Sequence, residues 1–267
     1  MPSKYLTLLD DDDVRRWYEN LAAKSAVTAG VYLRGLGLYC AMNGTTPGRI
    51  LREAKGKKFR DEFTDFVRRL EKEGRAGSYI GRFKKVLVSW ASYNDVELKL
   101  KVNIRGESSA PTLVDERVPT KEELSRILRN ATTRGRASVA LMAFCGLRPE
   151  VLGNYDGSDG LKVGDLPEMK VEGGRVKFDV VPTLLVVRGS LSKARHQYFT
   201  FVPQEALTYV VEHLEGRMSR GEVIDKESPM LGVDMRGQRR NVRRSPFLRT
   251  TLVTRDIREA IKRAGFS

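Results

Sequence analysis

The stretch FCGLRPEVL, residues 144–152, places an arginine where side-chain chemistry is expected. Gly146 interrupts an apolar helical pattern, and Pro149 suits the first turn of a new helix, where no backbone N–H is needed. A guanidinium at such a junction can bind phosphate through two parallel hydrogen bonds, together with free N–H groups of the new helix. The pattern indicates phosphate binding by Arg148, with an ordinary surface or structural arginine as the alternative.

The segment SYIGRFKKVLVSWASYN, residues 78–94, carries basic residues beside an apolar stripe. The stripe predicts a helix that buries one face, so Arg82, Lys84 and Lys85 fall on its other faces. Cations there can contact a phosphate backbone, because they displace its condensed counterions. We expect DNA contacts from this group, and a solvated helix face is the alternative.

Residues 236–249 form a second basic segment, with six arginines and no acidic residue. A solvated loop has the same composition, so the sequence does not place this segment on a partner. The expected DNA contacts within it are Arg239, Arg240, Arg243 and Arg244.

The net charge of +14 over 267 residues points to a polyanionic partner. Residues 1–110 hold 21 Lys or Arg against 14 Asp or Glu, and residues 111–267 hold 27 against 20, so each part carries +7. The excess is therefore spread along the chain, and we expect both halves to contact double-stranded DNA.

The remaining composition excludes several classes of protein. Cys40 and Cys145 are too few for a disulfide framework or a metal knuckle, and no apolar run reaches the roughly 20 residues of a membrane span. The acidic run at residues 10–13 fits a helix N-terminus, where carboxylates meet the macrodipole, so no metal is assigned. We expect a cytoplasmic, nucleoid-associated protein without a metal or small-molecule cofactor.

Apolar periodicity predicts a mainly α fold with a small antiparallel β-sheet, in the α+β class. Thr120 and Glu123 form a capping-box pattern that opens a second helical region after a stretch rich in Gly, Ser, Pro and charge. The predicted domains are 1–106 and 120–267, with a linker at 107–119. Helices are expected near 8–21, 25–44, 59–74, 78–94, 120–128, 136–146, 204–219 and 254–266, and strands at 175–181, 183–189 and 197–202.

A basic helical region, a linker, the stretch FCGLRPEVL and a β-hairpin with basic residues follow one another along the chain. With this order of features, the chain resembles the tyrosine recombinases of the phage-integrase type, with the archaeal or mobile-element branches the nearest. The arginine stretch is similar to the family motif G-L-R-x-x-E-L, although Val151 rather than a glutamate stands directly before the final leucine. The residues that carry the resemblance are Gly146, Leu147, Arg148, Glu150 and Leu152.

The resemblance implies a helical core-binding domain and a catalytic domain that clamp duplex DNA, with further protomers on paired recombination sites. It implies that Arg148 is catalytic, and that a catalytic lysine lies on the β-hairpin, where Lys193 is the best match and Arg195 the alternative. In the family such arginines neutralise phosphate oxygens and the lysine protonates the departing 5′ hydroxyl, without a metal.

Two parts of the family pattern do not occur in this sequence. A His-x-x-Arg box and a late nucleophilic tyrosine are expected, but neither His196 nor His213 has arginine three residues on, and no tyrosine follows the last predicted helix. We expect His213 on a helix surface. This chain alone is then expected to be inactive in cleavage, as a truncated, split or decayed form, because it cannot form the 3′-phosphotyrosyl intermediate.

Three hypotheses remain. The first is a site-specific recombinase or integrase that clamps DNA and, when complete, breaks and rejoins strands. The second is a non-catalytic DNA-binding protein on the same scaffold, acting as a regulator, a competitor or half of a split recombinase. The third is a general basic nucleic-acid-binding protein in which the two motifs are coincidental.

Overall fold

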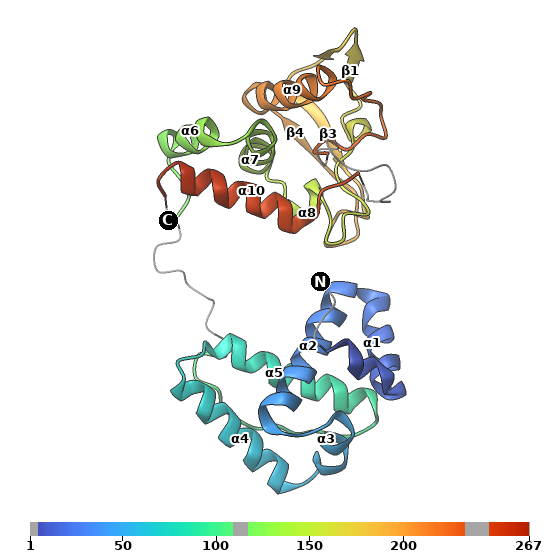
Figure 1. The fold of residues 1–267 in the computed structure, drawn as a ribbon, viewed down its shortest axis with the longest axis vertical. Coiled ribbons are helices and arrows are strands. Elements are labelled where there is room, and N and C mark those ends of the chain that lie inside the picture. Colours follow the sequence, from blue (N-terminus) through green and yellow to red (C-terminus); the bar gives the residue numbers. More distant parts are fainter. Residues whose placement is uncertain (1–4, 109–116, 233–245, 267) are drawn as a thin grey trace. The chain divides into compact units, whose positions relative to one another are not determined.

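The computed structural model describes residues 5–108, 117–232 and 246–266. It is mostly helical with two small antiparallel sheets, which confirms the predicted α+β class. The chain separates into two units, Met1–Arg117 and Val118–Ser267, each with its own core (Figure 1). The segment expected to link two domains falls partly on residues 109–116, which lie outside the described residues.

Helices account for the regular structure described in the first unit. The side chain of Asp11 accepts hydrogen bonds from the backbone N–H groups of Asp13 and Val14, at 2.9 and 3.2 Å, so the acidic run caps a helix as predicted. A short helix that was not predicted begins after Thr46, whose hydroxyl caps it. The elements are the 3-10 turn η1 (Leu6–Asp10), α1 (Asp12–Lys24), α2 (Ala26–Asn43), α3 (Pro47–Glu53), α4 (Lys57–Lys72) and α5 (Gly77–Tyr93).

Large rings fill the core of the first unit. Phe66 lies against Tyr39, Phe63 and Phe83, with ring centroids 5.1, 6.0 and 5.2 Å away. Val102 and Ile104, beyond the last helix, are also buried in this core. The chain therefore packs against the helices of this unit for some distance after α5 ends.

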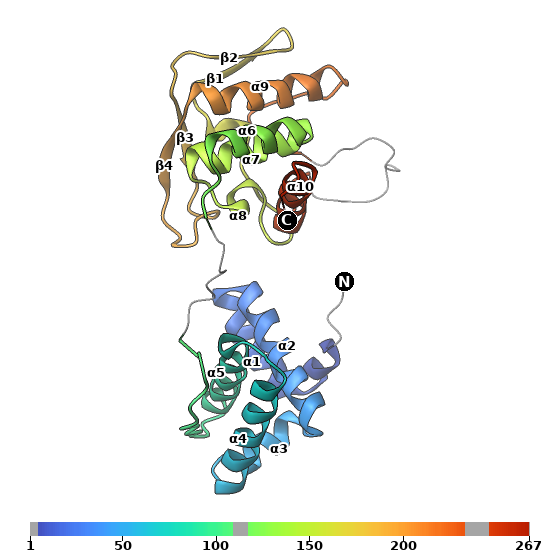
Figure 2. The same cartoon turned by 90° about the vertical axis from the view of Figure 1, so that its left-hand side faces the viewer.

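The second unit combines helices with the two hairpins. The predicted capping box is confirmed, because the Thr120 N–H donates to Glu123 Oε2 and the Glu123 N–H donates to Thr120 Oγ1, at 2.8 and 3.3 Å. Helix α7 lies between α9 and α10 in both views (Figures 1 and 2). The helical elements are α6 (Lys121–Asn130), α7 (Thr133–Cys145), α8 (Pro149–Leu152), the 3-10 turn η2 (Val163–Asp165), α9 (Gln204–Met218) and α10 (Thr250–Arg263).

Each sheet of the second unit is a two-stranded antiparallel hairpin. Strands β1 (Met169–Glu172) and β2 (Arg175–Phe178) pair around Gly173 and Gly174, both with positive φ, as a tight hairpin turn requires. Strands β3 (Thr183–Val187) and β4 (Tyr198–Val202) form the second hairpin.

The predicted strands differ from the observed ones in two respects. Strand β1 was not predicted, and the strand predicted at 175–181 ends at Phe178. Pro182, which precedes β3, has no N–H to donate to a ladder, so one continuous strand through this point is disfavoured. The strands predicted at 183–189 and 197–202 are present with slightly shorter bounds.

Candidate nucleic-acid interface

Arg148 lies at the junction of α7 and α8. Gly146 ends α7 in the left-handed conformation, with φ 67°, and its N–H donates to the carbonyl of Met142 at 3.1 Å. Leu147 is buried and anchors the turn, whereas Arg148 is exposed in an extended conformation directly before Pro149. The buried Leu147 therefore holds the turn against the core, and Arg148 points away from it.

Hydrogen bonds from three other elements hold this junction in place. The hydroxyl of Thr200 on β4 donates to the carbonyl of Cys145 at 3.2 Å. The N–H of Leu161 donates to the carbonyl of Val151 at 2.8 Å, and the hydroxyl of Thr250 at the start of α10 donates to the carbonyl of Gly153 at 2.6 Å. The backbone that carries Arg148 is thus fixed from both sides.

The side chain of Arg148 makes no hydrogen bond or ion pair with the residues that the structure describes. Glu150, two positions on, is also exposed, and Val151 is buried in the core of the second unit. A guanidinium that has no partner among these residues can bind an incoming phosphate through two parallel hydrogen bonds. This geometry allows phosphate binding at Arg148.

The connection between β3 and β4 carries the second pair of candidates. Lys193 and Arg195 are both exposed, and neither side chain has a hydrogen bond or ion pair within the described ranges. The backbone of Arg195 has φ 59°, a conformation uncommon for residues other than glycine, and its N–H donates to the carbonyl of Ser192 at 3.0 Å. Figure 2 shows this connection at the same end of the second unit as α8.

Arg188, which sequence reasoning missed, fixes the base of that connection. Its guanidinium donates to both carboxylate oxygens of Asp159 at 2.9 Å, to Asp165 Oδ1 at 3.0 Å and to the carbonyl of Gly160 at 2.6 Å. The hydroxyl of Ser190 also donates to Asp159, at 3.1 Å. The hairpin connection is therefore tied to the segment that follows α8.

Asp159 and Arg188 stabilise each other's charged forms. Burial acts to raise the pKa of Asp159, but the Arg188 guanidinium and the Gly160 N–H outweigh it, so the carboxyl pKa lies below its ordinary value. Burial likewise acts to lower the pKa of Arg188, and its two carboxylate partners raise it. Because its donors are satisfied by carboxylates and a carbonyl, Arg188 is a structural residue rather than a phosphate ligand.

The three basic residues predicted on α5 have different surroundings. Lys84 Nζ donates to the carbonyl of Val102 at 3.3 Å and to Glu107 Oε2 at 3.4 Å, so it holds the chain beyond α5. The guanidinium carbon of Arg82 lies 4.8 Å from the centre of the Tyr79 ring, and its buried Nε has no hydrogen-bond partner in the part of the chain that the structure describes. Lys85 is exposed. Of this group, Lys85 is the residue most accessible to a phosphate.

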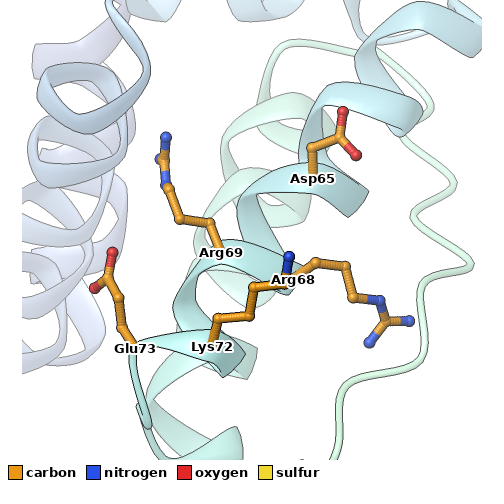
Figure 3. A pocket seen from close by; sticks show the side chains of 5 residues that line it. All are labelled: Asp65, Arg68, Arg69, Lys72 and Glu73. Atoms are coloured by element: carbon orange, nitrogen blue, oxygen red, sulfur yellow. The ribbon is translucent and has the colours of Figure 1, made fainter.

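A shallow hollow on α4 gathers further charge but does not make a convergent site. It is lined by Asp65, Arg68, Arg69, Lys72 and Glu73 (Figure 3). Figure 3 shows Arg68 and Arg69 leaving the helix in opposite directions. Arg68 donates to Glu71 Oε2 at 2.6 Å, and Arg69 donates to Asn43 Oδ1 at 3.2 Å. The two arginines are thus used within the first unit.

Most of the arginine-rich segment, residues 236–249, lies outside the described residues. Arg239, Arg240, Arg243 and Arg244 lie outside the described residues. Arg249, just after that segment, is exposed and donates from Nε to the carbonyl of Asp156 at 3.2 Å. The predicted DNA contacts of the four arginines remain predictions.

The expectation for His213 was wrong. It lies in α9, is 4% exposed, and neither ring nitrogen has a hydrogen-bond partner in the described part of the chain. Burial, with a smaller contribution from the charge of Arg217, lowers the pKa of His213 to about 3. The residue belongs to the stripe of α9 that packs into the core, with Val210, Leu214 and Arg217.

Similarity to known proteins is found among solved structures. No known family model matches the sequence, and no curated protein matches it. Among solved structures, a crystal structure of XerA recombinase is similar over 96% of this chain and 77% of its own, with 16% sequence identity and a TM-score of 0.39. No helix among the described residues is long and apolar enough to cross a membrane. No group of three or more His, Cys, Asp or Glu side chains in those residues is arranged to hold a metal ion.

Proposed function

We propose that this protein binds duplex DNA and acts in site-specific DNA recombination of the tyrosine-recombinase type. The observation that carries the proposal is the exposed Arg148 on a junction braced by β4 and α10, whose guanidinium has no hydrogen-bond or ion-pair partner among the described residues. The even distribution of the +14 charge supports phosphate contacts from both units. The G-L-R motif and the basic hairpin connection support the recombination type.

In this proposal the basic residues of the second unit act on one phosphodiester. Arg148 binds its nonbridging oxygens and neutralises the charge that grows on them during displacement. Lys193 suits the proton donor to the departing 5′ hydroxyl better than Arg195, because an arginine does not release its proton in proteins. Arg195 then supplies charge only. Neither the nucleophilic tyrosine nor the second arginine of the family is assigned to a residue of this sequence.

The test is to replace Arg148 with alanine and to measure the affinity for duplex DNA by fluorescence anisotropy at several salt concentrations. Loss of one phosphate contact is expected to reduce the slope of log K against log salt by about 0.9. Arg129→Ala is the matched control, because Arg129 is an exposed arginine in the last turn of α6 and its loss changes the net charge equally.

Equal slopes for Arg148→Ala and Arg129→Ala would contradict the assignment of Arg148 as a phosphate ligand. Circular dichroism of both variants shows whether the fold is intact. Comparison of duplex DNA with heparin of similar charge separates DNA recognition from general polyanion binding: indistinguishable affinities would favour a general basic binding protein.

A further inference from the structure

The outer face of the β3–β4 hairpin is apolar and aromatic. Side chains alternate across a strand, and the pairing places Leu184 opposite Phe201 and Val186 opposite Phe199 on one face. The other face, with Leu185 and its neighbours, is buried against the core. The inner face therefore already holds the hairpin on the core. The apolar side chains of the outer face are not needed for this, so their presence needs another explanation.

Phe199 and Phe201 are the most exposed residues of that outer face. Their side chains are 66% and 51% exposed, and their rings contact each other edge to face with centroids 6.0 Å apart. Burying a phenylalanine stabilises a fold by roughly 1.5–3 kcal/mol, and these two side chains forgo most of that stabilisation. Two adjacent exposed rings indicate a surface that binds a flat, apolar partner group.

The charge around these rings favours a polyanion as that partner. The sequence from Val180 to Gln204 contains Arg188, Lys193 and Arg195 and no acidic residue. Arg188 is neutralised by two carboxylates, whereas Lys193 and Arg195 have none within the described residues. A second copy of the same hairpin would bring like charges together, so self-association through this face is disfavoured. A nucleic-acid strand supplies both flat rings and negative charge.

We propose that Phe199 and Phe201 form a stacking platform for unpaired bases, with Lys193 and Arg195 on the phosphates of the same strand. The proposal rests on the DNA binding proposed above and extends it to a preference for DNA whose bases are locally unpaired. Residues at i and i+2 of a strand lie about 6.6 Å apart, so each ring can receive a separate base. The connection before Tyr198 places both cations at the start of the strand that carries the rings.

The test compares a fully paired duplex with the same duplex carrying a short run of mismatched bases at its centre. The two probes have equal length and charge, so their affinity ratio isolates the contribution of the unpaired bases. Aromatic stacking usually contributes a factor of about 5 to 150 per base. The intact chain is expected to prefer the mismatched probe by at least about fivefold, and the double variant Phe199→Leu, Phe201→Leu to lose that preference.

Leucine keeps the face apolar and compatible with a strand, so the variant removes the aromatic faces alone. Tyr155→Leu is the matched control, because Tyr155 is 56% exposed in the same unit but lies outside the hairpin. The double variant Phe199→Trp, Phe201→Trp is expected to keep the preference, since both side chains retain a stacking surface.

Each outcome decides between the proposals. Duplex binding without any preference for mismatched bases overturns the stacking platform and leaves the proposed function standing. Failure to bind either probe overturns the proposed function itself. Sedimentation that shows a dimer of the intact chain, converted to monomer by the double leucine variant, identifies a protein interface and overturns the platform.

Discussion

The cores of the two units differ in chemistry. The first is built from large rings, with Trp17, Trp90, Phe63, Phe66 and Phe83 nearly inaccessible to solvent. The second is aliphatic, and it contains every buried polar or charged side chain found among the described residues: Ser138, Asp165, Thr183, His213, Arg217 and Asp256. The core of the first unit is thus held by apolar packing, whereas the core of the second unit also contains polar contacts.

Several of the polar contacts in the second unit hold loops in position. Arg217 donates to the carbonyls of Pro229 and Met230 at 2.6 and 3.3 Å, and it also pairs with Glu222. Asp165 accepts from Arg188 at the base of the hairpin connection. Buried ion pairs are weak sources of stability but define geometry, because a displaced partner leaves an uncompensated charge. The unit that carries Arg148 and Lys193 is therefore the one in which, among the described residues, buried polar side chains hold loops in position.

The two tryptophans allow this difference to be measured. Trp17 and Trp90 both lie in the first unit, with ring centroids 5.4 Å apart, so tryptophan fluorescence follows the unfolding of that unit. Hydrogen exchange of peptides from 118–267 follows the second unit. The two probes therefore report on the two units separately.

The largest effect is expected from Phe66→Ala. Removing a ring that contacts three others leaves a cavity, and such changes cost about 3–5 kcal/mol of unfolding free energy. Urea denaturation followed by tryptophan fluorescence measures the loss. Phe201→Ala, which removes a half-exposed ring of the second unit, is expected to leave this transition unchanged. Equal small losses for both variants would contradict the role of Phe66 in the core.

A loss of similar or slightly smaller size is expected from Arg217→Ala. Removing the guanidinium leaves the buried carbonyls of Pro229 and Met230 without their donor, which costs about 1–3 kcal/mol for each acceptor, and it ends the pairing with the partly exposed Glu222. Hydrogen exchange in residues 222–231 should accelerate, while the fluorescence transition stays in place. Arg220→Ala, at an exposed position just after α9, is the control, and matching protection in both variants would contradict the prediction.

A moderate, pH-dependent effect is expected from His213. The pKa of His213 is about 3 in the folded protein, below its ordinary value of 6.5, because the ring is buried beside arginines. The unfolded chain therefore binds the extra proton between these two pH values. The stability of the second unit is complete above pH 6.5 and falls as the pH drops toward 3, by up to about 1.4 kcal/mol per unit.

The measurement is the unfolding free energy of His213→Leu relative to the parent chain at pH 7 and pH 5. Leucine cannot bind a proton, so the variant should gain stability relative to the parent by about 2 kcal/mol on going to pH 5. A constant difference between His213→Leu and the parent at both pH values would refute the cause assigned to the pKa.

The smallest effect is expected from Thr200→Val. It removes the hydrogen bond to the carbonyl of Cys145, which is worth about 0.5–1.5 kcal/mol, and frees one brace of the Arg148 junction. Thr200→Ser keeps a hydroxyl and is the matched control. Hydrogen exchange of residues 142–153 should increase in the valine variant and remain near the parental rate in the serine variant. Unchanged exchange in the valine variant would show that β4 does not brace the junction.

The sequence predicted the helices whose apolar stripes are long. Residues 59–74 and 78–94, for example, contain regular stripes that correspond to α4 and α5. The short α3 was missed, because seven residues contain too little periodicity, although Thr46 and Pro47 carry the start signal of a helix. Strand β1 was missed although Gly173 and Gly174 mark a hairpin turn beside it.

The site could be predicted in part. The position of Arg148 at a helix junction follows from local chemistry, because glycine ends one helix and proline opens the next. The burial of His213 could have been predicted from its helical spacing to the apolar residues Ala206 and Val210 on α9. The role of Arg188 could not, since its partner carboxylates lie 29 and 23 residues earlier and no local pattern links them.

The most direct test of the account is the salt dependence of duplex DNA binding by the intact chain. If Arg148, Lys193, Arg195 and basic residues of the first unit each neutralise a phosphate, the slope of log K against log salt should be about −4 or steeper. Fluorescence anisotropy titrations at a series of salt concentrations measure it. A slope near zero, or no binding at low salt, would contradict the central claim that this protein acts on DNA through its phosphates.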